Sequence, residues 1–207
     1  MDYELEQLVN GAAGHNPLLD AVMLLFAAWS EPAFILLVAV WFLLGVVLLR
    51  RAERHQAILA LLAAGLALLA NQVLGHIWDR PRPFAAHPAQ VHVLLAHAAD
   101  SSFPSDHMAA AVAIATILLA THRRLGIGLL VVSAVVGFAR VYVGDHYPGD
   151  VLVGAAIGVT AGIVLGRLAR PAMAVTDLVD SVLGSMRLLP RAKASNESDP
   201  ALFVKTR

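Results

Sequence analysis

The chain has 207 residues, of which 58% are hydrophobic and 14% are charged, and its mean hydropathy is +0.71. This balance lies outside the range of ordinary globular domains, so the chain is predicted to be an integral membrane protein. The formal net charge is zero, which gives no reason to expect a nucleic-acid partner. The absence of cysteine excludes a disulfide framework and a thiolate metal site.

Residues 1–16 are predicted to form an interfacial N-terminal segment. Acidic and apolar residues are interspersed in its first half, and the segment then breaks at a Gly-Ala-Ala-Gly-His-Asn-Pro run. This pattern favours a short amphipathic helix that lies on the membrane surface. The acidic start lacks the basic residues of a secretory signal, so insertion is expected to depend on internal apolar segments.

Apolar runs dominate residues 17–170 and predict an all-α fold, a polytopic membrane helix bundle with five to six transmembrane helices. The run 18–30 is too short to cross alone, and Glu31-Pro32 is predicted to separate it from the first full span. With six crossings both chain ends are cytoplasmic, and with five the N-terminus lies outside; the sequence leaves both open. The predicted full spans are 33–49, 55–78, 108–121, 125–139 and 151–165.

Residues 171–207 turn polar after Arg170-Pro171 and are predicted to form a cytoplasmic C-terminal tail. The apolar residues of 178–189 favour an amphipathic helix in this tail. The Lys-Ala-Ser-Asn-Glu-Ser-Asp-Pro run that follows predicts a disordered end.

The arginines assign the sides of the membrane. Counting crossings places three arginine clusters on one side, and the positive-inside rule makes that side cytoplasmic. Segments 79–103 and 140–149 then share the opposite side, and the candidate site residues lie in these segments or within four residues after them. The cytoplasmic clusters are Arg50, Arg51 and Arg54, then Arg123 and Arg124, then Arg167 and Arg170.

The first candidate motif is the Asp79-Arg80-Pro81-Arg82-Pro83-Phe84 run that follows a predicted span. Prolines stiffen the backbone, so the two guanidinium groups are presented on an extended segment. Their planar donors suit phosphate oxygens. The alternative is that both arginines only anchor the helix end at the interface.

The second motif is Ser101-Ser102-Phe103-Pro104-Ser105-Asp106-His107, which leads into an apolar run. Ser101 or Ser102 is predicted to cap the helix, with Pro104 in its first turn. The free backbone N–H groups and the Ser105 hydroxyl then form an anion site, and His107 points toward the same place. The alternative is an ordinary capped helix start with an incidental histidine.

The third motif spans Arg140 to Asp150 and brings together an arginine, a histidine and an aspartate. If a helix begins near His146, His146 and Asp150 share one face, because they are four residues apart. The carboxylate then accepts a hydrogen bond from one imidazole nitrogen and leaves the other free to attack. The alternative is a loop histidine beside a juxtamembrane salt bridge. The remaining outer histidines are predicted to be loop residues: His76, His87, His92 and His97.

Together the motifs supply arginines, a helix N-terminus, two histidines and a carboxylate on one side of the membrane. This set is suited to phosphoryl transfer without a metal, with cationic groups for the phosphate oxygens, a nucleophile and an acid. Clustered ligands with metal-binding spacing are not found in the sequence, so no metal and no cofactor are expected.

These motifs resemble the signature of the type-2 phosphatidic acid phosphatase (PAP2) superfamily. Its pattern is K-x6-R-P, then P-S-G-H, then S-R-x5-H-x3-D. The Pro-Ser-Asp-His form and the Arg-Pro-Arg-Pro-Phe run are similar to the bacitracin-resistance type of undecaprenyl-diphosphate phosphatase, with a resemblance over residues 16–182. The matching residues are Arg82-Pro83, Pro104-Ser105-Asp106-His107 and Arg140-x5-His146-x3-Asp150.

The resemblance implies a PAP2/vanadium-haloperoxidase-like core and an integral membrane phosphatase. It implies hydrolysis of undecaprenyl diphosphate through a phosphohistidine, which recycles the cell-wall lipid carrier and confers bacitracin resistance. The expected location is the bacterial cytoplasmic (inner) membrane, with the active site on the extracytoplasmic face and polyprenyl diphosphate and membrane lipid as partners. The implied catalytic residues are His146, His107 and Asp150. The implied phosphate-binding residues are Arg82, Arg140, Ser105 and Arg80.

Three positions depart from the family pattern. Gly75 replaces the lysine, so Arg80 or His76 is expected to supply its charge. Ala139 replaces the serine before the arginine and removes a hydroxyl. Asp106 replaces the glycine and adds a negative charge beside the phosphate unless it is paired or turned away.

Two other functions fit parts of the sequence. A phosphatidic acid or phosphatidylglycerol-phosphate phosphatase would use nearly the same site residues, because substrate choice lies in the helix walls. A lipid or antibiotic transporter subunit would need ionisable groups at mid-membrane depth, where only Asp20 is expected. The sequence does not determine the oligomeric state.

Overall fold

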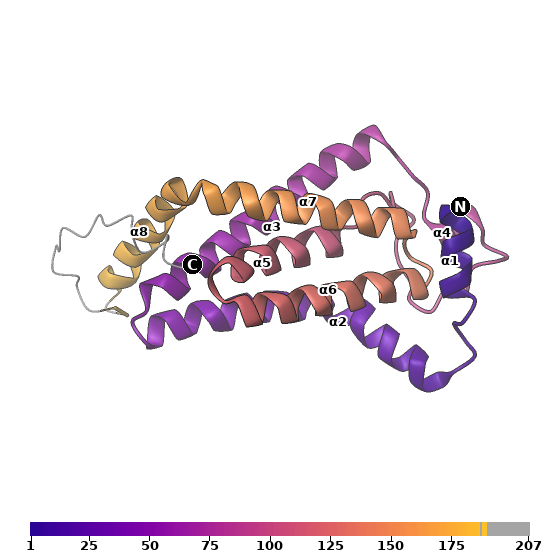
Figure 1. Cartoon of the computed structure of the whole chain (residues 1–207), viewed down its shortest axis with the longest axis horizontal. Coiled ribbons are helices and arrows are strands. Elements are labelled where there is room, and N and C mark those ends of the chain that lie inside the picture. The colour runs from indigo at the N-terminus through magenta and orange to yellow at the C-terminus, as the bar shows by residue number, and fades with distance from the viewer. Residues whose placement is uncertain (187, 190–207) are drawn as a thin grey trace.

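The computed structural model describes residues 1–186 and 188–189, and within them every regular element is a helix (Figure 1). The predicted all-α bundle is therefore confirmed. The elements are α1 (Asp2–Asn10), α2 (Pro17–Val47), α3 (Arg51–Ile77), α4 (Pro83–Ala86), α5 (Asp106–Thr121), α6 (Arg123–Tyr142), α7 (Pro148–Arg167) and α8 (Ala169–Ser185).

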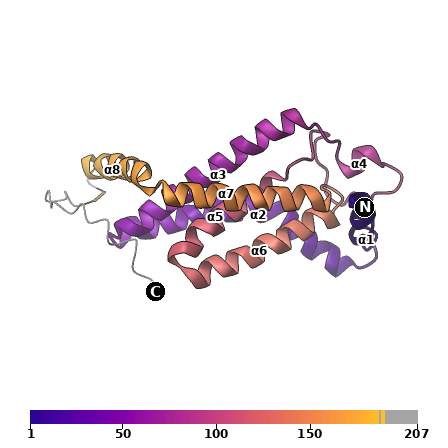
Figure 2. The ribbon, with the colours of Figure 1, turned by 45° about the horizontal axis from the view of Figure 1, so that its top comes forward.

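Five helices form the membrane bundle. α2, α3, α6 and α7 are each long and apolar enough to cross a membrane, and α5 is a shorter apolar helix of 16 residues. α5 lies at the centre and packs against α3, α6 and α7 (Figures 1 and 2). Alanines on α5 such as Ala109 and Ala113 are fully buried, and their small side chains allow the neighbouring backbones to approach.

α7 approaches α5 most closely through glycine. A Cβ added at Gly154 would lie 2.5 Å from the Ser105 carbonyl oxygen, and one added at Gly158 would lie 2.5 Å from that of Ala109. Ser105 N–H also donates to the Asp150 carbonyl oxygen at 3.1 Å. The two family motifs on α5 and α7 are therefore held together by backbone contact.

α2 differs from the prediction, because it runs through Glu31 and Pro32 as one helix of 31 residues. Asn16 caps it, accepting hydrogen bonds from two first-turn N–H groups at 3.1 and 3.2 Å. A proline removes one backbone hydrogen bond, but long apolar flanks keep the helix intact on both sides. The predicted break is therefore wrong. Of the two counts that the sequence left open, the structure supports five: four helices long enough to span and the shorter α5.

The chain passes between the two ends of the bundle at each crossing. The α2–α3 turn, the α5–α6 turn and the α7–α8 junction lie at one end, and α1 and α4 lie at the other (Figure 1). The arginine clusters around those turns thus share an end, as predicted. With five crossings the N-terminus lies at the opposite end, beside α4.

The first part of the predicted tail is a helix that docks on the bundle. The amphipathic helix predicted over 178–189 begins earlier, as α8 at Ala169. Arg54 is buried and donates to both carboxylate oxygens of Asp180, at 2.7 and 2.9 Å, and to the Gly45 carbonyl oxygen at 2.7 Å. These bonds fix α8 against the α2–α3 turn. The predicted disordered end lies outside the described residues.

The predicted N-terminal helix is present as α1 and packs on the connections at its end of the bundle (Figure 2). The amide of Asn10 is buried and donates to the carbonyl oxygens of Tyr142 and His92, both at 2.8 Å. Tyr3 stacks on His87 with 3.7 Å between ring centroids. α1 therefore covers the loops that carry the candidate motifs.

Candidate active site

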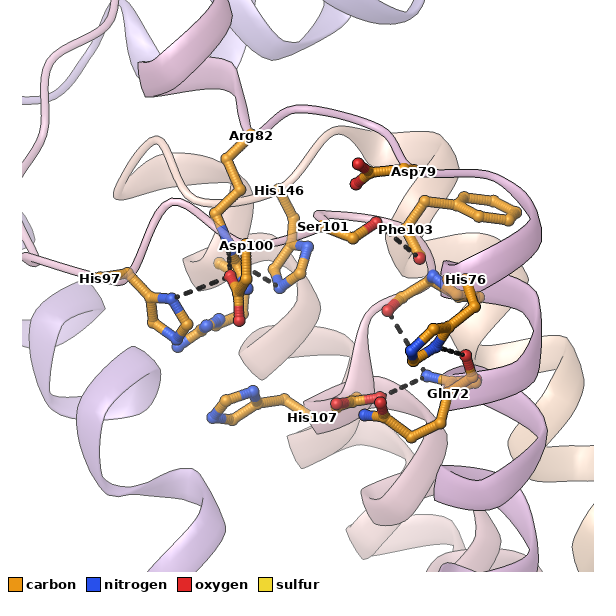
Figure 3. A pocket seen from close by; sticks show the side chains of 15 residues that line it. Gln72, His76, Asp79, Arg82, His97, Asp100, Ser101, Phe103, His107 and His146 are labelled. Carbon is orange, nitrogen blue, oxygen red and sulfur yellow. Dashed lines mark hydrogen bonds and ion pairs between the residues drawn. The ribbon is translucent and has the colours of Figure 1, made fainter.

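A cavity of about 450 Å³ lies at the end of the bundle where α1 and α4 are found (Figure 3). Its walls come from the last turns of α3, the connections on either side of α4, the start of α5 and the α6–α7 connection. Three predicted site residues lie outside this lining: Arg80, Ser105 and Asp150. Four predicted site residues line it: Arg82, His107, Arg140 and His146.

His146 is buried in the α6–α7 connection, and its partners fix its tautomer. Nδ1 lies 2.8 Å from the Ser102 carbonyl oxygen, which can only accept, so Nδ1 carries the proton. Nε2 lies 3.4 Å from Nη1 of Arg82, which can only donate, so Nε2 carries the lone pair. Burial lowers the pKa of His146, although Asp150 and Asp145 oppose this effect. His146 is therefore a neutral imidazole with an available nucleophilic nitrogen.

Asp150 does not make the predicted hydrogen bond to His146. Its Oδ2 lies 3.8 Å from Nδ1 of His146 and instead accepts from the backbone N–H of Tyr147 at 2.9 Å. The reason is that α7 begins at Pro148, so His146 precedes the helix and the two residues do not share a helical face. Asp150 caps α7 and is an electrostatic neighbour of the imidazole, while the Ser102 carbonyl orients the ring.

Arg80 has partners that differ from the phosphate contact predicted for it. Nη1 lies 2.9 Å from Oδ1 of Asp150, which is fully buried, and 2.7 Å from Oδ2 of Asp2 on α1. The guanidinium also stacks on Tyr147, with 3.7 Å between Cζ and the ring centroid. Arg80 therefore contacts Asp150 and does not line the cavity, and the phosphate contact predicted for it stays a prediction.

Asp145 joins the two arginines of the cavity, and no motif had assigned it a role. Nη1 of Arg82 donates to its Oδ1 at 2.7 Å, and Arg140 forms an ion pair with its Oδ2. Burial raises the pKa of Asp145, but Arg140, His146 and Arg82 outweigh it, so the net pKa lies below the ordinary value. Asp145 thus stays ionised and positions both guanidinium groups. Its place directly before His146 was the one available signal.

The start of α5 lies later than predicted. Ser105 is its N-cap, and the proposed caps Ser101 and Ser102 precede the helix, where Ser101 forms an antiparallel bridge with Pro81. Ser102 N–H donates to the Arg80 carbonyl oxygen at 2.8 Å, which keeps this segment out of the helix. The hydroxyl of Ser105 is buried and has no hydrogen-bond partner among the described residues. An unpaired buried hydroxyl is costly, so Ser105 is well suited to a bound anion.

His107 and Asp106 follow in the first turn of α5. His107 lines the cavity, and its Nε2 lies 3.7 Å from Oε2 of Glu31 on α2. Asp106 accepts a hydrogen bond from the side-chain amide of Asn71 at 2.9 Å. Asp106 is therefore hydrogen-bonded to a neutral amide on α3, and within the described part of the chain no cation forms an ion pair with its carboxylate, although it lines the cavity.

Gly75 stands at the position of the family lysine. A Cβ there would lie 3.1 Å from the Phe103 carbonyl oxygen, so a side chain at this position would require a small shift of that backbone. His76, predicted to be in a loop, lies in the last turn of α3 and lines the cavity, as His97 also does. His76 is thus the residue near Gly75 that supplies a titratable group. Within residues 1–186, three or more metal-ligating side chains do not cluster at any one place.

Residues 56–173 match the PAP2 superfamily. The chain belongs to this superfamily. It is 35% identical over 181 residues to undecaprenyl-diphosphatase BcrC of Bacillus subtilis (strain 168), which covers 86% of this chain and 90% of that protein. The family predicted from the three motifs is confirmed.

Two solved structures share the fold. Aquifex aeolicus LpxE superposes with a TM-score of 0.63 at 31% identity, covering 79% of this chain and 93% of LpxE. The first transmembrane PAP2 type phosphatidylglycerolphosphate phosphatase from Bacillus subtilis has a TM-score of 0.65 at 25% identity, covering 82% and 85%. The PAP2-type transmembrane bundle is therefore confirmed as the fold.

The PAP2 match contains all three motifs but begins after α1 and α2. Both excluded helices nevertheless contact the site. Asp2 on α1 binds Arg80, the Ala27 carbonyl oxygen on α2 accepts from Arg140 at 3.2 Å, and Glu31 faces His107. Sequence reasoning from the motifs gave no signal for these contacts.

Proposed function

We propose that the protein hydrolyses undecaprenyl diphosphate to undecaprenyl phosphate and inorganic phosphate, through a phosphohistidine. The observation that carries the proposal is the neutral His146, whose Nε2 lone pair lies beside two buried arginines at the cavity wall. The similarity to an undecaprenyl-diphosphatase over most of the chain supports the choice of lipid. The product is the lipid carrier, so this activity recycles the carrier for wall synthesis and protects it from bacitracin.

In the first step Nε2 of His146 attacks the terminal phosphorus in line. The N–P bond forms as the bridging P–O bond breaks, and the electron pair of that bond leaves with undecaprenyl phosphate. Arg82, Arg140 and the Ser105 hydroxyl at the start of α5 stabilise the charge on the phosphoryl oxygens. His107 donates a proton to the leaving oxygen.

In the second step water attacks the phosphohistidine. His107, now neutral, takes a proton from the water, the P–N bond breaks, and inorganic phosphate leaves with Nε2 of His146 restored. During both steps Nδ1 of His146 stays protonated and bonded to the Ser102 carbonyl oxygen. Asp150, at 3.8 Å, stabilises the positive charge that the ring carries as phosphohistidine.

We place the protein in the bacterial inner membrane with the cavity on the extracytoplasmic face. The positive-inside rule supports this orientation, because the arginine-rich turns share the end opposite the cavity. The chain has no cysteine, so single cysteines can be labelled without background. A membrane-impermeant maleimide should label Ala98→Cys near the cavity in intact cells. Thr121→Cys at the opposite end should be labelled only after lysis.

The decisive assay is phosphate release by the purified protein in detergent, with undecaprenyl diphosphate and phosphatidic acid as parallel substrates. Wild type should release phosphate mainly from the diphosphate, and His146→Ala should release none above background. A preference for phosphatidic acid would keep the mechanism and overturn the substrate. Equal release by wild type and His146→Ala would overturn the site assignment.

A further inference from the structure

The N-terminal half of α2 lies outside the PAP2 match and contacts two residues that line the cavity. The two contacts come from positions little more than one helical turn apart, Ala27 and Glu31. The Ala27 carbonyl oxygen accepts from Arg140, Ser30 is buried, and Oε2 of Glu31 lies 3.7 Å from Nε2 of His107. The segment that the sequence marked only as a break between two spans therefore packs against the residues of the site.

Glu31 is an unusual residue for its place in the fold. It lies near the middle of a 31-residue apolar helix, directly before Pro32, and its side chain is 68% exposed on the bundle surface. An ionisable side chain on a membrane helix is costly unless it has a partner or a function. Two ionisable groups of the site lie near Glu31: His107, whose Nε2 is 3.7 Å from Oε2 of Glu31, and Arg140, whose positive charge the Glu31 carboxylate favours.

His107 needs such a partner if it is to hold a proton. The other charged or titratable groups that face it are Arg140 on α6, Asp145 and His146 in the α6–α7 connection, and His97 before α5. Of these only Asp145 is anionic, and it is already paired with two arginines. A second anion is therefore required for a stable imidazolium beside the arginines.

We propose that Glu31 is a positioning residue for His107, acting behind it as Asp150 acts behind His146. This inference rests on the proposed function, in which His107 is the acid and then the base. Glu31 lies on the Nε2 side of the ring, at 3.7 Å, and stabilises the protonated form of His107 through its charge. Nδ1 is then the nitrogen that gives its proton to the leaving lipid phosphate and later removes one from water. Glu31 itself exchanges no proton with the substrate.

The test is a titration of His107 by NMR of histidine-labelled protein in detergent, with the signal assigned by its loss in His107→Asn. Glu31→Gln should lower the titration midpoint of His107 by about 0.8 pH unit, the effect of one charge near 4 Å screened as in water. Asp20→Asn is the matched control, because Asp20 is a carboxylate on the same helix whose Oδ1 accepts from the Tyr142 hydroxyl at 2.7 Å. Asparagine keeps that acceptor, so the midpoint should not move.

The pH dependence of kcat gives the second readout. The alkaline limb of the profile is where His107 loses its proton. In Glu31→Gln this limb should shift to lower pH by the same amount, whereas a merely structural role of Glu31 would leave the limb at the same pH. An unchanged midpoint of His107 in Glu31→Gln, or a shift equal to that in Asp20→Asn, would overturn the inference. If wild type releases no phosphate from the lipid diphosphate, the proposed function fails, and the NMR titration still decides whether Glu31 controls His107.

Discussion

Replacing Arg80 with glutamine tests whether this residue supports Asp150 or binds phosphate. In the structure Nη1 of Arg80 lies 2.9 Å from the fully buried carboxylate of Asp150 and 2.7 Å from Asp2. Arg80→Gln removes the cation next to a buried anion and leaves the cavity lining intact. The expected defect is therefore in the placement of Asp150 and His146, and phosphate affinity should be preserved.

The cost in stability follows from the exposure of the pair. A buried ion pair that loses one partner typically costs about 3–5 kcal/mol. Arg80 is 27% exposed, so water replaces part of its contribution. We therefore expect a loss of about 2 kcal/mol, the value for a hydrogen bond to a charged group. For a chain of this size that corresponds to a fall of roughly 4–8 °C in the thermal unfolding midpoint in detergent.

The effect on the rate has a definite sign. Without Arg80 the Asp150 carboxylate, 3.8 Å from Nδ1, is no longer neutralised, so it stabilises the imidazolium of free His146 more strongly. The pKa of His146 should therefore rise in Arg80→Gln. Because the neutral ring is the nucleophile, the variant should lose activity on acidification at a higher pH than wild type does. The acid limb of the pH profile of kcat/KM should therefore shift to higher pH in Arg80→Gln.

The assay is steady-state phosphate release from a polyprenyl diphosphate, with Arg82→Gln as the matched comparison. Arg82 lines the cavity, so its loss should raise KM by about tenfold or more, whereas Arg80→Gln should lower kcat and change KM by less than about twofold. A large rise in KM for Arg80→Gln, with thermal stability and the acid limb unchanged, would refute this reasoning. Arg80 would then be a phosphate ligand, as the sequence alone predicts.

Three further predictions concern the nucleophile and the helix packing. His146→Asn should reduce phosphate release by about three orders of magnitude or more, and acid-labile labelling of the protein by a terminally ³²P-labelled substrate should disappear with it. Because burial lowers the pKa of His146 from 6.5, kcat/KM should hold its plateau as the pH falls through 6.5 and decline only below it, which a pH–rate profile measures. Gly154→Ala places a Cβ 2.5 Å from the Ser105 carbonyl oxygen and should lower the free energy of unfolding by about 1–3 kcal/mol. Gly128→Ala is the control, because a Cβ there meets no atom within 4 Å and should leave stability unchanged or raise it. Thermal unfolding in detergent compares the two variants.

The sequence predicts well those parts of the site that follow from the order and spacing of its motifs. Arg82, His107, Arg140 and His146 come from three separate segments, and each lines the same cavity. The arginine clusters and the apolar runs were enough to bring these segments to one end of the bundle. Hydropathy and topology therefore determine where the polar residues gather.

The sequence did not predict the contacts that backbone groups make, or those of carboxylates outside the motifs. The hydrogen-bond acceptor of His146 is the Ser102 carbonyl oxygen, which every residue type possesses, so no letter of the sequence marks it. The helical spacing of His146 and Asp150 predicts a direct bond, but α7 begins only at Pro148. Local spacing fails here because the start of a helix decides which residues share a face.

The sequence also predicted the bounds of α2 incorrectly. Pro32 is read as a break, since proline removes a backbone donor, yet the helix continues through it. In a membrane the cost of leaving the helix is greater, because every exposed backbone group would lack a partner. The apolar flanks on both sides therefore decide the outcome, and Glu31 lies near the middle of a helix rather than at its start.

The two helices that precede the PAP2 match contribute in parallel to the two proposed catalytic histidines. α1 reaches His146 through Asp2, Arg80 and Asp150, and α2 reaches His107 through Glu31. In each case a carboxylate lies just under 4 Å from the imidazole, at 3.8 and 3.7 Å, close enough to influence its protonation and too far for a direct hydrogen bond. The residues proposed to contact phosphate belong to the family motifs, whereas two of the carboxylates that influence the histidines, Asp2 and Glu31, lie outside the family match. Differences in pH dependence between this protein and its relatives are therefore expected to follow α1 and α2 more closely than the motifs.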